Sequence, residues 1–251
     1  MRYIILDRIR GVTLLSMIFY HAVWDLVNLY GAGWDWYSGK ISYVWQQSIC
    51  WTFILLSGFC FSLGKRKIRR GLLVFAGGAL VSAVTVIAMP DSRIVFGILS
   101  FLGAAMLIMV FLQKILQKIN VYAGLAITSL LFVITKNVNK GYLGWGKLHF
   151  ADLPHTLYRN LFTTCLGFVE DGFFSTDFFS LIPWMFLFIA GYYLYGIAER
   201  KGLLSKMRGY PEKTAWPVCI IDWTGRHSLI IYLLHQPIIY AVLYIFHLLV
   251  T

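Results

Sequence analysis

Long apolar stretches are the feature that most restricts what this chain can form. Seven stretches reach, or nearly reach, the roughly 20 apolar residues needed to cross a bilayer; they cover residues 10–30, 42–63, 71–90, 94–112, 120–136, 178–198 and 218–249. Only 13% of the 251 residues are charged, against about 25% in soluble domains. A soluble enzyme is therefore nearly excluded. The sequence predicts an all-α, polytopic membrane bundle of about seven helices, built as one domain over residues 1–251.

The segment 137–177 is the least regular part of the chain. It contains Gly, Pro and Asp residues, which favour turns, but also a moderately apolar run from Leu157 to Phe168. We expect a partly buried or re-entrant loop here, with an eighth span as the alternative.

Basic residues are distributed unevenly between the two sides of the predicted bundle. If the connecting segments alternate between the sides, the side of the N-terminus carries 16 Lys and Arg residues and the other side carries 6. Because basic residues are retained in the cytoplasm, the N-terminus is predicted inside and the C-terminus outside. The net charge of +11 is then explained by the orientation of the bundle and by contact with anionic lipid headgroups. The charged residues are too sparse along the chain to indicate a nucleic-acid partner.

The first predicted span contains ionisable residues that the membrane interior normally excludes. His21 follows Arg10 by eleven residues, close to three helical turns, so the two side chains share a face. Asp25 lies one turn beyond His21 on that face. Arg10 can hold a phosphate at the cytoplasmic mouth, and His21 can accept a proton while Asp25 fixes its tautomer. The alternative is a charged anchor followed by an interhelical His–Asp pair.

The last predicted span contains a second polar group. His235 and Gln236 fall near mid-membrane, and Pro237 frees a backbone carbonyl in the preceding turn. These groups suit the binding of a polar ligand at depth, whereas the alternative is a proline kink satisfied by local side chains. Arg226, at the cytoplasmic entry, can add to an anion site or anchor the helix.

Aromatic and acidic residues outside the spans are less specific. Tryptophans and tyrosines near the span ends are expected first as interfacial anchors and only secondarily as ligand contacts; examples are Trp34, Trp36, Tyr37, Trp145 and Trp184. The outer loop contains histidines and carboxylates whose spacings match no metal-ligand pattern, so we expect a solvated or sugar-contacting surface there and no metal site. Four scattered cysteines predict no disulfide.

The polar spans resemble a known family. Leu6-Asp7-Arg8-Ile9-Arg10-Gly11, with His21 and Trp24-Asp25-Leu26 after it, is similar to the first span of bacterial proteins related to the heparan-alpha-glucosaminide N-acetyltransferase catalytic domain. The run from Gly225 to Pro237 resembles the last span. The resemblance covers essentially the whole chain, and the spacing of Arg10 and His21 also resembles the broader acyltransferase-three group of membrane acyltransferases.

The resemblance implies a transmembrane acyltransferase in the inner or plasma membrane of a bacterium. Such an enzyme transfers an acyl group, usually acetyl from cytoplasmic acetyl-CoA, to an extracytoplasmic acceptor, here a sugar or glycan. The expected catalytic residues are His21 and Asp25, and the expected contacts of acyl-CoA are Arg10, Arg70, Arg226, His235 and Gln236. A histidine that follows the motif in the lysosomal enzyme has no secure match here, so His21 is expected either as the base or as a transition-state partner. Direct transfer and an acyl-histidine route both stay open.

Two other functions use the same residues. A proton-coupled transporter of a polar solute would employ His21, Asp25 and His235 as a relay, although no inverted repeat is detectable. The second alternative is a non-enzymatic receptor or scaffold of seven helices. The sequence leaves the oligomeric state open, and a homodimer is allowed.

Overall fold

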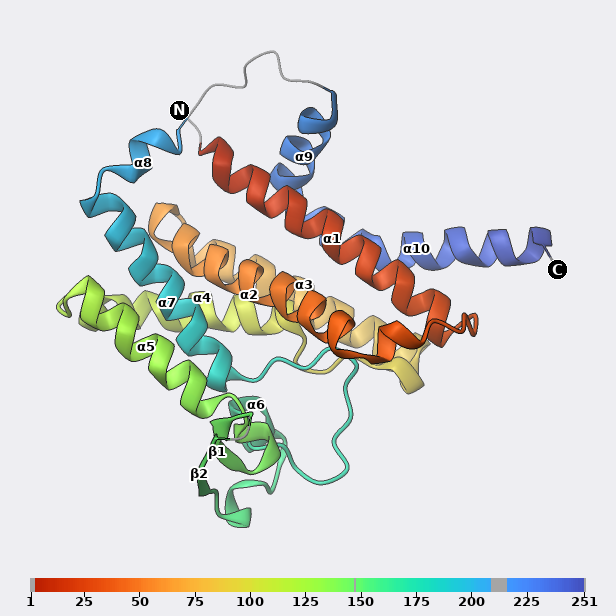
Figure 1. Ribbon diagram of the computed structural model, residues 1–251, viewed down its shortest axis with the longest axis horizontal. Coiled ribbons are helices and arrows are strands. Elements are labelled where there is room, and N and C mark those ends of the chain that lie inside the picture. Colours follow the sequence, from red (N-terminus) through yellow and green to blue (C-terminus); the bar gives the residue numbers. More distant parts are fainter. Residues whose placement is uncertain (1–2, 147, 209–215, 251) are drawn as a thin grey trace. The chain divides into compact units, whose positions relative to one another are not determined.

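The structure, a computed structural model, describes residues 3–146, 148–208 and 216–250. The predicted all-α class is confirmed, because 76% of the residues that the structure describes are helical. Six helices in the described part are long and apolar enough to cross a membrane. They are α2 (Lys40–Leu63), α3 (Lys67–Ala88), α4 (Ile98–Leu116), α5 (Val121–Thr135) extended by the following turn to Lys140, α7 (Leu181–Arg200) and α10 (Ser228–Val250) (Figure 1).

The first helix, α1 (Ile4–Asn28), is also long enough to span a bilayer at 25 residues, but it carries charged residues and is more polar than those six. With α1 the fold agrees with the predicted total of about seven helices.

The last predicted stretch, 218–249, does not form one continuous helix. The structure divides it into α9 (Trp216–Arg226) and α10, with a break at His227. At 11 residues, α9 is too short to cross a bilayer. The break has a packing cause, because α9 buries Asp222, Thr224 and Gly225 on one face against α1, whereas α10 is apolar on most sides. Four charges that entered the orientation argument, Arg2, Lys147, Glu212 and Lys213, lie outside the described residues.

The segment 137–177 is a loop and contains no eighth span in its described residues. It holds the antiparallel pair β1 (Tyr142–Trp145) and β2 (Leu148–Asp152), the short helix α6 (Leu161–Leu166), and two 3-10 turns, η3 (Val138–Lys140) and η4 (His155–Leu157). The longest helix among them, α6, has 6 residues. Asn137 fixes the hairpin to α5, because its side-chain amide donates a 2.9 Å hydrogen bond to the carbonyl of Gly144.

The chain divides into two compact units. The first comprises residues 1–53 and 202–251, and the second residues 54–201. In the first unit, α1 packs against α9 and α10; this unit also holds η1 (Asp35–Ser38) and α8 (Leu203–Lys206). The α2 helix begins in the first unit and ends in the second.

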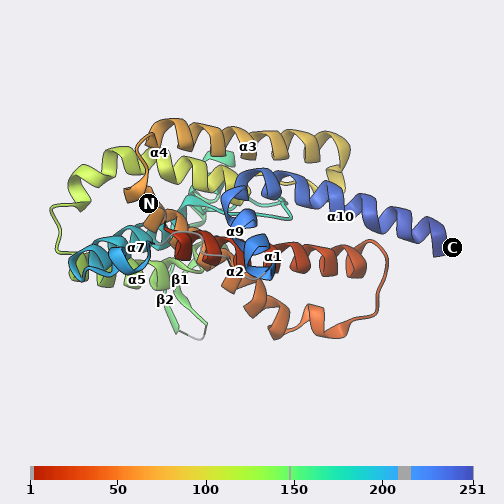
Figure 2. The ribbon, with the colours of Figure 1, turned by 90° about the horizontal axis from the view of Figure 1, so that it is seen from above.

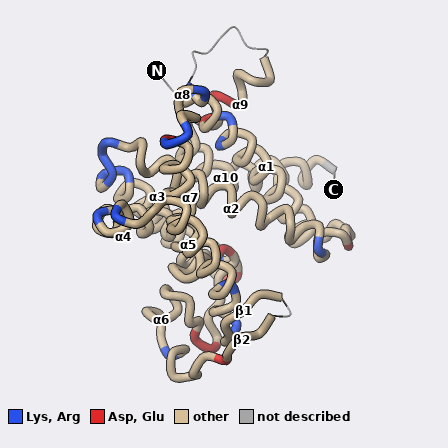
Figure 3. The backbone as a smooth tube through the Cα atoms, turned by 60° about the vertical axis from the view of Figure 1, so that its left-hand side comes forward, with Lys and Arg blue, Asp and Glu red and all other residues tan. Residues whose placement is uncertain are grey.

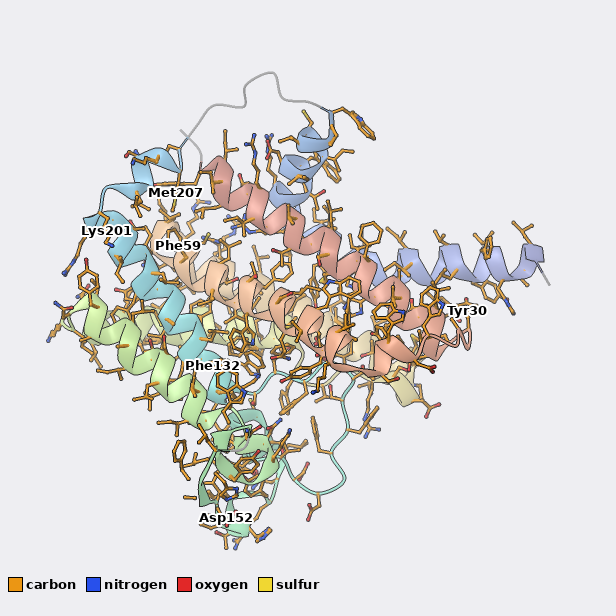
Figure 4. The ribbon with its side chains drawn as sticks, in the orientation of Figure 1. Tyr30, Phe59, Phe132, Asp152, Lys201 and Met207 are labelled. Carbon is orange, nitrogen blue, oxygen red and sulfur yellow. The ribbon has the colours of Figure 1, made fainter. Side chains whose placement is uncertain are left out.

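The second unit is built from two helix pairs. The helices α3 and α4 lie side by side (Figure 2), and α5 packs on α7. Glycine permits the first contact, since a Cβ atom on Gly103 of α4 would lie 2.4 Å from the backbone nitrogen of Phe75. In the second pair, Phe132 of α5 (labelled in Figure 4) stacks beside Trp184 of α7 with ring centroids 5.6 Å apart. Lys136 closes this contact, with its Nζ 3.9 Å from the Trp184 ring centroid.

In the second unit, most basic residues cluster at one end of the helices and most acidic residues at the other. Figure 3 shows Lys and Arg where α3 begins and where α4 and α7 end, whereas Asp and Glu gather near α6. The basic end comprises Lys65, Arg66, Lys67, Arg69, Arg70, Lys114, Lys118, Arg200 and Lys201. The cytoplasmic position of these helix ends was inferred from the same residues and stays a prediction.

The acidic end of the second unit is ordered by a carboxylate. Asp177, just before α7, accepts a 3.1 Å hydrogen bond from the backbone N–H of Ile98 in the first turn of α4. The neighbouring Ser175 accepts another from Val95, at 3.0 Å. A carboxylate at this position satisfies a free N–H group of the helix start. Burial nevertheless raises the pKa of Asp177 to about 6, and the hydrogen bond from Ile98 opposes that rise only in part.

We expect Asp177→Asn to remove a pH dependence of stability. Because the folded pKa lies above the usual value of 3.8, the protonated side chain favours the fold. Its contribution is complete at low pH and is lost as the pH rises through about 6. The asparagine retains an oxygen for Ile98 but does not ionise. The melting temperature of wild type, measured in detergent between pH 4.5 and 7.5, should therefore fall relative to that of the variant; parallel pH curves would contradict this account.

Candidate functional site

Two glycines allow close packing of α1 and α9, the helices that carry Arg10 and Arg226. A Cβ atom on Gly225 of α9 would lie 1.9 Å from the carbonyl oxygen of Asp7. A Cβ atom on Gly11 of α1 would lie 2.1 Å from the carbonyl oxygen of Ile221. Any side chain at either position would force the backbones apart, so these glycines allow α1 and α9 to touch directly.

Charged residues reinforce the same crossing. Arg8 donates from Nε to Asp222 Oδ1 at 3.0 Å, and Asp222 is only 3% exposed. Arg10 donates to Asp7 Oδ1 at 3.0 Å and to the carbonyl of Gly225 at 3.3 Å. The predicted phosphate-binding arginine is thus oriented by α9, and these contacts occupy one nitrogen of its guanidinium group. The sequence did not predict the Arg8–Asp222 pair, because Asp222 lies more than 200 residues away from Arg8 in the chain.

The other two predicted cofactor cations belong to different units. Arg226 is exposed at the end of α9, and Arg70 is exposed in the first turn of α3, in the second unit. Arg70 and Lys67 lie beside Phe61 and Met106, and the space between these four side chains does not hold a water molecule. Lys67 donates a 2.6 Å hydrogen bond to Gln113. Two neighbouring cations at the surface attract an anionic group such as a phosphate.

The deeper part of the site joins α1 to α10 through Asp25. This side chain is fully buried, with 0% exposure. Gln236 donates from Nε2 to Asp25 Oδ1 at 2.7 Å. The expectation that Asp25 would hold His21 is therefore not met, since Asp25 turns toward α10 and no hydrogen bond joins it to His21. Spacing along α1 placed the two residues on one face, but it could not reveal a competing amide on another helix.

Two histidines meet beside this pair. The rings of His21 on α1 and His235 on α10 have centroids 5.0 Å apart and are inclined by 59°. His235 is 9% exposed, and its Nδ1 lies 2.5 Å from the carbonyl oxygen of Tyr232. A carbonyl oxygen only accepts hydrogen bonds, so Nδ1 carries the hydrogen. In the neutral ring, Nε2 of His235 therefore presents a lone pair.

Three buried atoms of this cluster have no hydrogen-bond partner among the described residues. They are Asp25 Oδ2, Gln236 Oε1 and His235 Nε2. All three are acceptors, because Gln236 uses its amide nitrogen toward Asp25 and His235 uses Nδ1 toward Tyr232. A buried polar atom without a partner costs about 1–3 kcal/mol. The cluster is therefore complementary to a ligand, or to water, that brings several hydrogen-bond donors.

Apolar side chains adjoin the polar cluster. Leu14 and Met17 of α1 form a buried group with Ile49 of α2, and Tyr232 and Ile231 of α10 pack against it. The polar atoms thus lie beside a close-packed core, where low polarity strengthens hydrogen bonds to a bound group.

Comparison of the sequence with models of known protein families identifies the family of this chain. Residues 2–237 match the family of heparan-alpha-glucosaminide N-acetyltransferase, catalytic domain. The chain belongs to this family. The matched region runs from the start of α1 to Pro237, so it includes every residue of the polar cluster and all five predicted acyl-CoA contacts. No curated protein and no solved structure matches the chain.

Membership confirms the resemblance noted in the sequence and supports a membrane acetyltransferase in general. Together with the six apolar helices, it makes this an integral membrane protein. The family uses acetyl-CoA as the donor. The individual roles of His21, Asp25 and the arginines are not tested by the match and stay predictions.

Proposed function

We propose that the protein transfers an acetyl group from cytoplasmic acetyl-CoA to an extracytoplasmic sugar or glycan, with His21 as the base. The observation that carries the proposal is the buried polar cluster of α1 and α10. It places two histidines, a carboxylate and an amide together in a membrane protein, and leaves three acceptor atoms available for a ligand. Polar groups retained inside a membrane at such cost typically serve function.

The donor would be held by its anionic end. Arg10 is oriented by Asp7 and Gly225, and Arg226 is exposed nearby in sequence at the end of α9, so both suit phosphate groups on the predicted cytoplasmic side. Arg70 and Lys67 offer a second pair of cations in their own unit. Acetyl-CoA, when bound, supplies an activated thioester, in which a new bond from the acceptor to the acetyl carbon replaces the carbon–sulfur bond.

The chain's residues would move the proton and orient the acceptor. His21 accepts the proton that the attacking amine or hydroxyl loses, which is the usual task of a catalytic imidazole. Asp25 Oδ2, Gln236 Oε1 and His235 Nε2 accept hydrogen bonds from the other hydroxyl and amino groups of the acceptor and so fix the direction of attack. Gln236 keeps Asp25 in place through the 2.7 Å hydrogen bond.

A sided transfer assay tests the proposal. The protein is reconstituted in proteoliposomes with a glucosamine oligosaccharide inside and radiolabelled acetyl-CoA outside, and the orientation of the protein is determined by protease accessibility. We expect labelled oligosaccharide inside the vesicles, formed only by protein whose N-terminal side faces the coenzyme.

The alternative function predicts a different result in the same vesicles. A proton-coupled transporter would accumulate solute with the proton gradient and without coenzyme A. Gradient-driven uptake with no labelled product would therefore replace the acetyltransferase proposal.

A further inference from the structure

A line of aromatic rings leads from the segment between α1 and α2 toward His21. Trp34, just before η1, is 42% exposed, and Trp36, within η1, is 41% exposed. Their rings are inclined by only 22°, with centroids 6.4 Å apart. Trp36 is in turn inclined by 25° to Trp45 of α2, at 6.5 Å. The three indoles therefore form a strip of nearly parallel faces.

The strip continues inward from Trp45. Tyr20 of α1 meets Trp45 edge to face, with centroids 5.2 Å apart, and lies 5.8 Å from the ring of its neighbour His21. Tyr37 closes the other side of Tyr20 at 5.5 Å. All of these residues belong to the first unit, which also contains the polar cluster. The aromatic line thus connects an exposed segment with the acceptor atoms around His235.

Anchoring in the lipid interface does not account for this arrangement. An interfacial belt requires only that separate aromatic side chains reach the headgroup level. Here Trp45 is held inside the unit, because its indole N–H donates a 2.8 Å hydrogen bond to Ser16 of α1. Centroid separations of 6.4 and 6.5 Å at small inclinations correspond to offset stacking, in which each ring covers only part of the next.

We propose that Trp34, Trp36 and Trp45 form the binding path of the acceptor and that its occupant is the pyranose ring of a glycan. The flat apolar faces of a sugar ring match indole faces, while its hydroxyl and amino groups bring the donors that Asp25 Oδ2, Gln236 Oε1 and His235 Nε2 lack. Asp35 is exposed and lies between Trp34 and Trp36 in the sequence, so its carboxylate can accept hydrogen bonds from hydroxyl or amino groups of a sugar bound at these tryptophans. The inference rests on the proposed function and gives the acceptor a different entry from the outer loop 137–177.

The test compares Trp36→Ala, Trp36→Phe and the control Trp145→Ala. Trp145 is an equally exposed tryptophan, at 44%, but lies in the hairpin of the other unit. We expect Trp36→Ala to raise the KM for a glucosamine tetramer by about 10-fold, the size of one lost aromatic contact, and to leave the KM for acetyl-CoA unchanged. Trp36→Phe should retain most of the wild-type KM, and Trp145→Ala all of it.

A binding measurement without the donor separates this inference from the proposed function. Tryptophan fluorescence is titrated with the glucosamine tetramer and with spermidine, an amine that has no sugar ring. Quenching by the tetramer alone, lost in Trp36→Ala, supports the path even if no acetylation occurs. Equal responses to spermidine, or acetylation with an unchanged acceptor KM in Trp36→Ala, would overturn it and leave the acetyltransferase proposal standing. A loss of melting temperature in Trp36→Ala without any change in acceptor KM would show an anchor and also overturn it.

Discussion

Replacing His21 with alanine is expected to reduce acetyl transfer by ~10²–10⁴-fold, the usual contribution of a general base. The loss should appear in kcat rather than in the KM for acetyl-CoA, because His21 is proposed to act on the acceptor's proton and not on the coenzyme's phosphates. Single-turnover transfer from radiolabelled acetyl-CoA measures it directly. The same experiment distinguishes the two routes, since label retained on wild type and absent from His21→Ala indicates an acyl-histidine.

The matched control is His247→Ala. Unlike His21 on α1, His247 lies near the end of α10, where its ring centroid is 5.3 Å from that of Tyr30 (Tyr30 is labelled in Figure 4). This variant should transfer acetyl groups at the wild-type rate. A His21→Ala protein that binds acetyl-CoA, melts as wild type does and keeps full activity would refute the role of His21.

Substituting Gly225 with leucine is expected to prevent α1 and α9 from packing. Even the first side-chain carbon would lie 1.9 Å from the carbonyl oxygen of Asp7, a backbone atom that cannot move without displacing the helix. Separation of the helices would also break the hydrogen bond from Arg10 to the carbonyl of Gly225 and strain the Arg8–Asp222 pair. We expect little monodisperse protein in detergent and a clearly lower melting temperature, measured by size-exclusion chromatography after heating.

Gly33→Ala serves as the control for this substitution. A Cβ atom there would meet no atom within 4 Å, so the variant should elute and melt as wild type does. If Gly225→Leu behaved like Gly33→Ala, the direct contact between α1 and α9 would be contradicted.

The sequence predicted the parts of the fold that depend on hydrophobicity and length. The apolar stretches from 42–63 to 178–198 each correspond to a long helix, because a span must satisfy its backbone internally and cover its length with apolar side chains. For 218–249 the same criterion found a span but not its start, because the span begins at Ser228. The first part of the stretch carries Asp222, Thr224 and Gly225, which pack against α1, and this tertiary contact gives α9 its own direction.

The site was predicted as a set of residues but not as a set of contacts. Helical spacing placed Arg10, His21 and Asp25 on one side of α1, and the composition of the last span drew attention to His235 and Gln236. The pairing of Asp25 with Gln236, 211 residues away, depends on how two helices dock, and no local pattern records that. The aromatic line from Trp34 to Tyr20 was missed for the same reason: Trp34, Trp36 and Tyr37 were interpreted one by one as interfacial anchors first, and Trp45 and Tyr20 were given no role.

The central claim is that the cluster formed by His21, Asp25, His235 and Gln236 is where acetyl transfer takes place. A cryo-electron microscopy map of the full chain with a non-hydrolysable acetyl-CoA analogue tests it most directly. We predict density for the phosphates at Arg10 and Arg226, and density for the acetyl group beside His21 and His235. An analogue bound with its acetyl end away from both histidines would contradict the account.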